Sequence, residues 1–142
     1  MNPAYLQAVF AWEGTEPLPP SFAIITAYHQ NGRISPESRN KHQDATLHQV
    51  LLGRGLKPVR VVGMSPDGAH REPSWAVTVD EVSALALGRL FKQEAVFLIR
   101  EGRLFVCKCS QKQRPNEERE VEMGAWPSAP NAPMSLAEAL EH

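Results

Sequence analysis

The segment from residue 65 to residue 74, SPDGAHREPS, carries the most chemically versatile side chains of the sequence. His70 and Glu72 are candidates for a general acid and base, and Arg71 between them is suited to stabilising an anion. Together these groups would serve the hydrolysis of a phosphodiester without a metal ion. The other interpretation is structural: Asp67 and Gly68 form a turn, and Arg71 pairs with Glu72 to brace the loop. The sequence leaves both interpretations open.

A second polar group follows the first predicted strand and enters a predicted helix. It comprises Asn31, Arg33, Arg39, Asn40 and Asp44. Arginines beside the start of a helix favour a bound phosphate or carboxylate, because the free amide groups and the helix dipole attract anions. The alternative is a solvated surface in which the same side chains form local salt bridges and Asn40 or Asp44 orders Arg33.

The two cysteines give only a weak metal signal. Cys107 and Cys109 are separated by one residue, whereas zinc sites space their cysteines by two to four residues, and the sequence has no second pair. On a strand both thiols face the same side as Phe105, toward a core. We therefore expect no metal and no cofactor, and no phosphate-binding loop, dinucleotide or nucleophile-elbow motif is present.

Hydrophobic periodicity and turn residues predict the elements that position these groups. The expected elements are a short helix within 3–12, a strand at 22–28, a helix at 36–53, strands at 58–64 and 74–79, a helix at 81–92, and strands at 94–100 and 103–109. The fold class is therefore α/β (α+β), with a small mixed sheet of about five strands in the order strand, helix, strand, strand, helix, strand, strand.

The helix between the first two strands predicts a right-handed crossover that joins parallel strands. Their C-terminal ends would then share one edge of the sheet, where open α/β sheets bind ligands. The two polar loops, Ser74 and the end of the second helix would meet at this edge. The candidate ligand-binding residues are therefore Asn31, Arg33, Arg39, Asn40, Asp67, His70, Arg71, Ser74 and Gln93.

The composition and net charge of the sequence indicate which class of protein it encodes. The chain has 142 residues, of which 42% are hydrophobic and 22% charged, and a net charge of -1. These values are ordinary for a globular domain, and the net charge does not favour nucleic acid or an acidic membrane surface. We expect one domain at 1–109 and a mobile, polar and proline-rich tail at 110–142, whose last residues can form a short helix.

The sequence shows no sign of export or membrane insertion: no apolar run approaches the ~20 residues that cross a bilayer, and the N-terminus lacks the pattern of a signal peptide. The thiols stand too close for an ordinary disulfide along one strand, which favours a reducing compartment. We therefore expect a cytoplasmic protein.

Three stretches, FAIITAY, SPDGAHREPS and FKQEAVFLI, resemble an uncharacterised bacterial family, domain of unknown function 3293. The resemblance covers roughly residues 3–109. Its best motif is Asp67-Gly68 followed by the run 71–74, with Gln93 and Glu94 after the second helix. The resemblance implies a small α/β domain, and it implies no particular activity.

The leading functional hypothesis is a module that binds a small anionic ligand, such as a nucleotide, a phosphate or a carboxylate. Its pocket would consist of Arg33, Arg39, His70, Arg71 and Gln93. The alternatives are a metal-independent hydrolase or nuclease at the same site, with His70 and Glu72 as catalytic candidates, and a protein-interaction adaptor that uses the tail or an exposed strand edge. A protein partner is not specified by the sequence.

Overall fold

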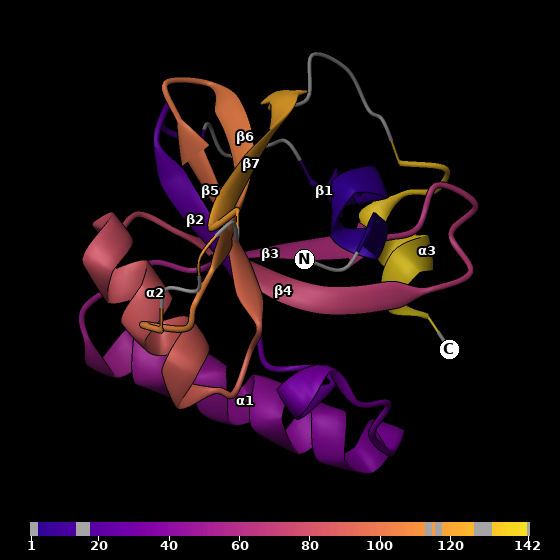
Figure 1. Cartoon of the computed structure of the whole chain (residues 1–142). Coiled ribbons are helices and arrows are strands. Elements are labelled where there is room, and N and C mark those ends of the chain that lie inside the picture. Colours follow the sequence, from indigo (N-terminus) through magenta and orange to yellow (C-terminus); the bar gives the residue numbers. More distant parts are fainter. Residues whose placement is uncertain (1–2, 14–17, 113–114, 116–117, 127–131, 142) are drawn as a thin grey trace.

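The computed structural model describes residues 3–13, 18–112, 115, 118–126 and 132–141. Its elements, in chain order, are η1 (Pro3–Gln7), β1 (Val9–Trp12), β2 (Phe22–Thr26), η2 (Gln30–Gly32), α1 (Glu37–Gly53), β3 (Val59–Met64), β4 (Arg71–Val77), α2 (Glu81–Leu90), β5 (Ala95–Arg100), β6 (Arg103–Lys108), β7 (Glu120–Ala125) and α3 (Leu136–Leu140). Figure 1 shows α1 and α2 together on one side of the strands.

The strands form one seven-stranded sheet in the order β1-β3-β4-β2-β5-β6-β7, and all neighbouring strands are antiparallel. The α+β class is confirmed, but the prediction of about five strands in a mixed sheet is wrong. One additional strand comes from the segment 3–12, which was expected to be helical. Its helix ends at Gln7, and β1 then pairs with β3. The apolar residues of β1 alternate between two separate clusters, with Phe10 in one and Ala11 in the other, which is the period of a strand.

The predicted parallel pair also needs correction. β2 and β3 run in the same direction, but β4 lies between them and is antiparallel to both. The segment from β2 to β5 is therefore the split β-α-β arrangement of ferredoxin-like domains, extended by β1 on one side and by β6 and β7 on the other. Because β2 and β3 share a direction, their C-terminal ends still meet at one edge of the sheet, as the sequence predicted.

The described residues form three apolar clusters, and the two largest lie on opposite faces of the sheet. On one face α1 and α2 bury a cluster that includes Ile25, Leu47 and Leu87. On the other face no long helix of the described part of the chain covers the strands, and the sheet curls so that residues from its two ends meet (Figure 1). Trp126 follows β7, and its ring centroid lies 5.3 Å from those of both Phe10 and Trp12 of the β1 side. Both tryptophans are partly buried and pack against this second core.

The fold continues beyond residue 109, where the sequence placed the end of the domain. β7 pairs with β6, and α3 packs against β1 and β3 with buried Leu136 and Ala139. Ser135 caps α3 and forms a capping box with Glu138, so the terminal helix expected from the sequence is present. Residues 113–114, 116–117 and 127–131 lie outside the described residues. The mobility predicted for this part of the chain stays a prediction.

The thiols lie where strand alternation placed them. Cys107 and Cys109 are both buried in the core beneath the helices, and both are free. Burial raises the pKa of Cys107 to about 11 and that of Cys109 to about 12. The two thiols are therefore packing groups rather than nucleophiles. Among the described residues, no helix combines the length and apolar character needed to cross a bilayer.

Candidate functional site

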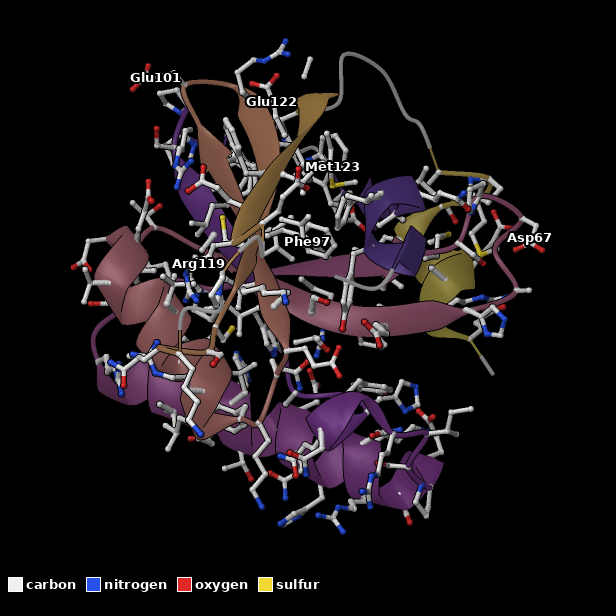
Figure 2. All side chains as sticks on the ribbon, in the orientation of Figure 1. Asp67, Phe97, Glu101, Arg119, Glu122 and Met123 are labelled. Atoms are coloured by element: carbon white, nitrogen blue, oxygen red, sulfur yellow. The ribbon has the colours of Figure 1, made fainter. Side chains whose placement is uncertain are left out.

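A pocket of about 830 Å³ opens at the sheet edge where β2 and β3 end. Its apolar wall is formed by Ala8, Ile34, Met64 and Phe97. Its polar wall comes from five separate segments of the chain and comprises Tyr5, His29, Ser65, His70, Arg71, Glu72, Gln93, Glu94 and Glu141. In Figure 2, Phe97 lies near the middle of the molecule, and Asp67 lies at the outer tip of the connection between β3 and β4.

Glu72 is the most perturbed acid of the pocket. It lies on β4 opposite Gly63 of β3 and is half-buried. Burial is the cause that raises its pKa from 4.5 to about 7. His70 precedes it by two residues and lines the same pocket. A carboxyl group that exchanges its proton near neutral pH can serve as a hydrogen-bond donor, an acceptor or an acid-base group.

Tyr5 and Glu94 form a second polar pair. The hydroxyl of Tyr5 donates to Oε2 of Glu94 at 3.5 Å, although 89 residues separate them. Burial and the negative charge of Glu94 raise the pKa of Tyr5 above its usual value. The Glu94 carboxylate lies so close to Gly32 that a Cβ there would stand 2.4 Å from Oε1. Gly32 also has a φ of +69°, so the backbone at this position favours glycine, whereas the flexible Glu94 side chain would have to move aside for any other residue.

His29 is held at the pocket by its backbone and by its ring. Its φ is 48°, in the left-handed region that residues with a Cβ rarely adopt. Its N–H donates to Oδ1 of Asn40 at 3.0 Å, and its Nδ1 accepts from the N–H of Ser35 at 3.2 Å. Asn40 is only 1% exposed, so this predicted ligand contact instead lies inside the fold and orders the loop.

Comparison with known families gives one match: the model described as protein of unknown function (DUF3293) matches residues 25–96. The chain belongs to the DUF3293 family. The matched range runs from β2 to the start of β5 and includes His29, Glu72 and Glu94. No curated protein and no solved structure matches the chain.

Arg71 lines the pocket, and two of its guanidinium nitrogens are bound by backbone carbonyls. Its Nε donates to the carbonyl of Gly68 at 2.9 Å, and its Nη1 donates to the carbonyls of Glu138 at 3.2 Å and Glu141 at 3.1 Å. The guanidinium therefore joins the β3–β4 turn to the C-terminal end of α3. The structural interpretation from the sequence paired Arg71 with Glu72, whereas the hydrogen bonds of Arg71 in the structure go to backbone carbonyls.

We predict that Arg71→Ala lowers the free energy of unfolding by about 1–2 kcal/mol, because three carbonyl groups lose a charged donor. Arg71→Lys should recover only part of this loss, since one ammonium group cannot match the geometry of the fork. Amide hydrogen exchange of residues 136–141 should be faster in both variants. The contrary result would be that the wild type binds inorganic phosphate and that Arg71→Lys weakens this binding. It would contradict this prediction and support Arg71 as an anion-binding residue.

The remaining arginines and Asn31 of the predicted anion site lie outside the pocket. Arg33 is exposed and does not line it. Arg39 is also exposed and donates to Oε1 of Gln30 at 3.4 Å. Asn31 lines a shallower neighbouring hollow together with Arg89. The loops thus meet at the sheet edge as predicted, but the side chains of Arg33, Arg39 and Asn31 lie outside the pocket.

Three other candidates serve the loops of the DUF3293 domain. Oδ1 of Asp67 accepts from Ser65 Oγ at 2.7 Å and from Ala69 N–H at 3.0 Å, which is the predicted turn and which lowers the pKa of Asp67. Ser74 is buried and donates to the carbonyl of Glu72 at 2.9 Å. Gln93 does line the pocket, and its Nε2 donates to the carbonyl of Tyr28 at 3.0 Å.

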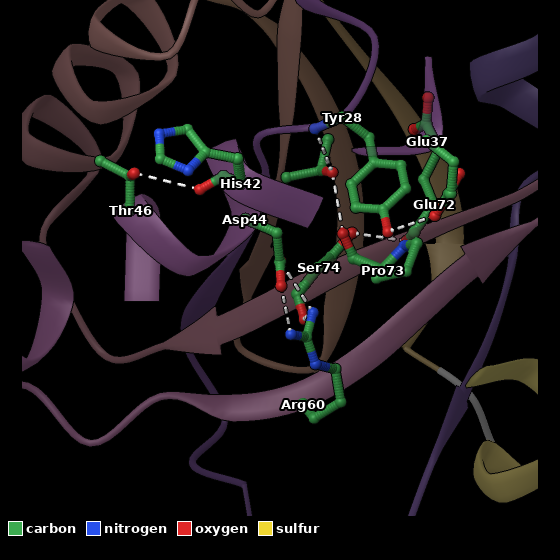
Figure 3. A network of polar contacts seen from close by, with 10 residues as sticks. Tyr28, Glu37, His42, Asp44, Thr46, Arg60, Glu72, Pro73 and Ser74 are labelled. Atoms are coloured by element: carbon green, nitrogen blue, oxygen red, sulfur yellow. Dashed lines mark hydrogen bonds and ion pairs between the residues drawn. The ribbon is translucent and has the colours of Figure 1, made fainter. Parts of the chain in front are cut away.

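Asp44 belongs to a network that fastens α1 to the sheet (Figure 3). Its carboxylate receives two hydrogen bonds from Arg60 of β3, at 2.9 and 2.6 Å. The Arg60 guanidinium lies 3.6 Å from the ring centroid of Trp75, and His48 of α1 stacks on the same ring at 4.2 Å. Asp44 therefore sets the position of α1, from which Asn40 reaches the pocket loop.

Several pocket residues were absent from the predicted site. Tyr5 stood in a segment interpreted as an amphipathic helix, and Phe97 stood in a strand where an aromatic residue indicates core packing. His29 and Glu94 were placed at the correct edge but were not selected as binding residues. The asparagine-glycine turn beside His29 was the available signal, because a turn that needs left-handed residues also determines where its neighbours lie.

Proposed function

We propose that this DUF3293 domain binds a small organic ligand in the pocket formed by the ends of β2 and β3. The apolar body of the ligand would contact Phe97 and Met64, and a polar group would face Glu72. The observation that carries the proposal is a preformed pocket of about 830 Å³ that combines an apolar wall with a carboxyl group of raised pKa. Small-molecule sites in proteins have this size and this mixture of surfaces.

The ligand that we propose is neutral or cationic, unlike the anion expected from the sequence. Arg33 and Arg39 do not line the pocket, and Arg71 is engaged by backbone carbonyls. Two carboxyl groups, those of Glu72 and Glu94, do line it. A bound anion would meet these acids, and the Nε and Nη1 donors of Arg71 are already bound by backbone carbonyls. The same feature disfavours phosphodiester hydrolysis, which needs a cation to stabilise developing negative charge.

The test is an NMR titration of the full chain with three probes of one shape: benzamide, benzamidinium and benzoate. We expect benzamide or benzamidinium to shift the amide signals of residues 29–35, 64–72 and 93–97. Benzoate should leave them unchanged. If neither benzamide nor benzamidinium shifts these signals, the chain does not have the proposed function. If benzoate alone shifts them, an anionic ligand becomes the better hypothesis.

Two variants separate pocket binding from binding elsewhere. Ala69→Trp places a large ring at an exposed position that lines the pocket and should abolish the shifts. Ala45→Trp adds the same ring at an exposed position on α1, which does not line the pocket, and should leave the titration unchanged. Equal responses of both variants would show that the probes bind at another surface.

A further inference from the structure

The ring of His29 is fixed in one protonation pattern by its neighbours. Nδ1 accepts a hydrogen bond from the N–H of Ser35 at 3.2 Å. Nδ2 of Asn40 stands 3.4 Å from the same nitrogen. A ring nitrogen that accepts a hydrogen bond from a backbone N–H carries no proton of its own, so the neutral ring has its proton on Nε2.

The orientation of Asn40 is itself determined by the backbone. Its Oδ1 accepts from the N–H of His29 at 3.0 Å, and its Nδ2 donates to the carbonyl of Ser35 at 3.1 Å. A rotated amide would set two donors against each other and two acceptors against each other. Asn40 can therefore offer only a donor to Nδ1 of His29. Since Asn40 is 1% exposed, water does not compete for these contacts.

We infer that His29 is a preset hydrogen-bond donor of the pocket, positioned by Asn40, and that the ligand is an uncharged carboxamide or lactam. The carbonyl oxygen of such a group would accept from Nε2 of His29, and its N–H would donate to the carboxyl of Glu72 or Glu94. This inference rests on the proposed function and specifies its ligand class. The left-handed backbone of His29 fits a functional role, because strain of this kind persists where the surrounding contacts impose it.

The three probes differ in how well they match this arrangement. Benzamide offers one acceptor and one donor, as the pocket requires. Benzamidinium offers donors only and leaves Nε2 of His29 without an acceptor. Benzoate offers acceptors only and places a negative charge beside two acids. We therefore expect benzamide to bind more tightly than either ion.

The first experiment observes the histidine ring directly, without any ligand. A long-range proton–nitrogen NMR spectrum of the full chain distinguishes the two neutral forms of each imidazole, and the His29→Asn variant assigns the signal. Asparagine is chosen because it tolerates a positive φ. We expect His29 to be protonated on Nε2 at neutral pH, and a proton on Nδ1 would overturn the inference.

The second experiment changes the positioning residue. Asn40→Asp replaces the donor beside Nδ1 by a carboxylate oxygen, which favours a proton on Nδ1. We expect the imidazole signal of His29 to change to that of the form protonated on Nδ1. The preference for benzamide over benzamidinium and benzoate should then disappear. Asn31→Asp is the matched control, because it makes the same change at an exposed left-handed position of the same loop. An unchanged imidazole signal in folded Asn40→Asp would contradict the positioning role.

The third experiment does not depend on the folding of the Asn40 variant. His29→Asn should weaken benzamide binding about five- to tenfold, the effect of one hydrogen bond, and should change benzamidinium binding much less. Equal benzamide binding in wild type and His29→Asn would overturn the inference while leaving the proposed function in place. If none of the three probes binds although the ring is protonated on Nε2, the proposed function fails and the ligand class fails with it.

Discussion

Glu72→Gln is expected to stabilise the protein at pH 8 and to change its stability little at pH 4.5. The raised pKa of Glu72 means that the folded state keeps a proton which the unfolded state loses as the pH rises from 4.5 to about 7. The contribution of this residue is therefore most favourable below pH 4.5 and is lost as the pH rises through 7. Glutamine has no charge to bury, so the variant avoids this loss.

The expected gain at pH 8 is at most about 3 kcal/mol, since a tenfold change in an equilibrium constant corresponds to about 1.4 kcal/mol. Partial exposure of Glu72 to solvent should reduce the gain below this limit. Urea denaturation of both chains at pH 4.5 and pH 8 measures it, and Glu13→Gln at an exposed position serves as the control. A variant that is less stable than wild type at pH 8 would show that the carboxylate has a favourable partner and that its burial is not costly.

The second large effect is expected for Trp126→Ala, which should lower the free energy of unfolding by about 2–4 kcal/mol. Removing a large aromatic ring from a core costs about 3–5 kcal/mol, and Trp126 is only half-buried. Its ring packs against Phe10, Trp12 and Phe22, with centroids 5.2–5.3 Å away. The loss should appear as a lower midpoint in urea denaturation.

Val82→Ala is a suitable control, because Val82 is 77% exposed and should contribute little. The comparison also decides how the C-terminal part of the chain behaves. If Trp126→Ala unfolds at the wild-type midpoint, residues 118–126 add little to the core, and the tail predicted from the sequence would be the better description. A lower midpoint would make these residues part of the cooperative fold.

The features that could be read from the sequence are those that depend on neighbours along the chain. Asp80 starts α2 because its side chain accepts from the N–H of Ser83, three residues away. The turn at Glu101 and Gly102 joins β5 to β6 because both residues adopt a positive φ. The alternation that buries Cys107 with Cys109 is equally local. Such signals made the α+β class and most of the helices and strands predictable.

The site was predictable only as far as strand direction determines it. Because β2 and β3 run the same way, the loops that carry His29 and His70 had to reach one edge, and both line the pocket. Which side chains enter that pocket depends on partners that are distant in sequence. Tyr5 meets Glu94 across 89 residues, and Arg71 reaches the carbonyl of Glu141 across 70. No local pattern encodes such contacts.

Sequence by itself thus determined the local elements and the edge at which the polar loops gather, because backbone preferences and turn residues act over a few positions. Tertiary structure alone decided that β4 lies between β2 and β3, that Trp126 packs against the second core, and that Arg71 donates to carbonyls of the C-terminal helix. The reason is that these outcomes follow from which buried surfaces and unpaired carbonyls meet after the chain has folded. Glu72 shows the consequence: its residue type was visible from the start, but its burial, and with it a pKa near 7, exists only in the assembled pocket.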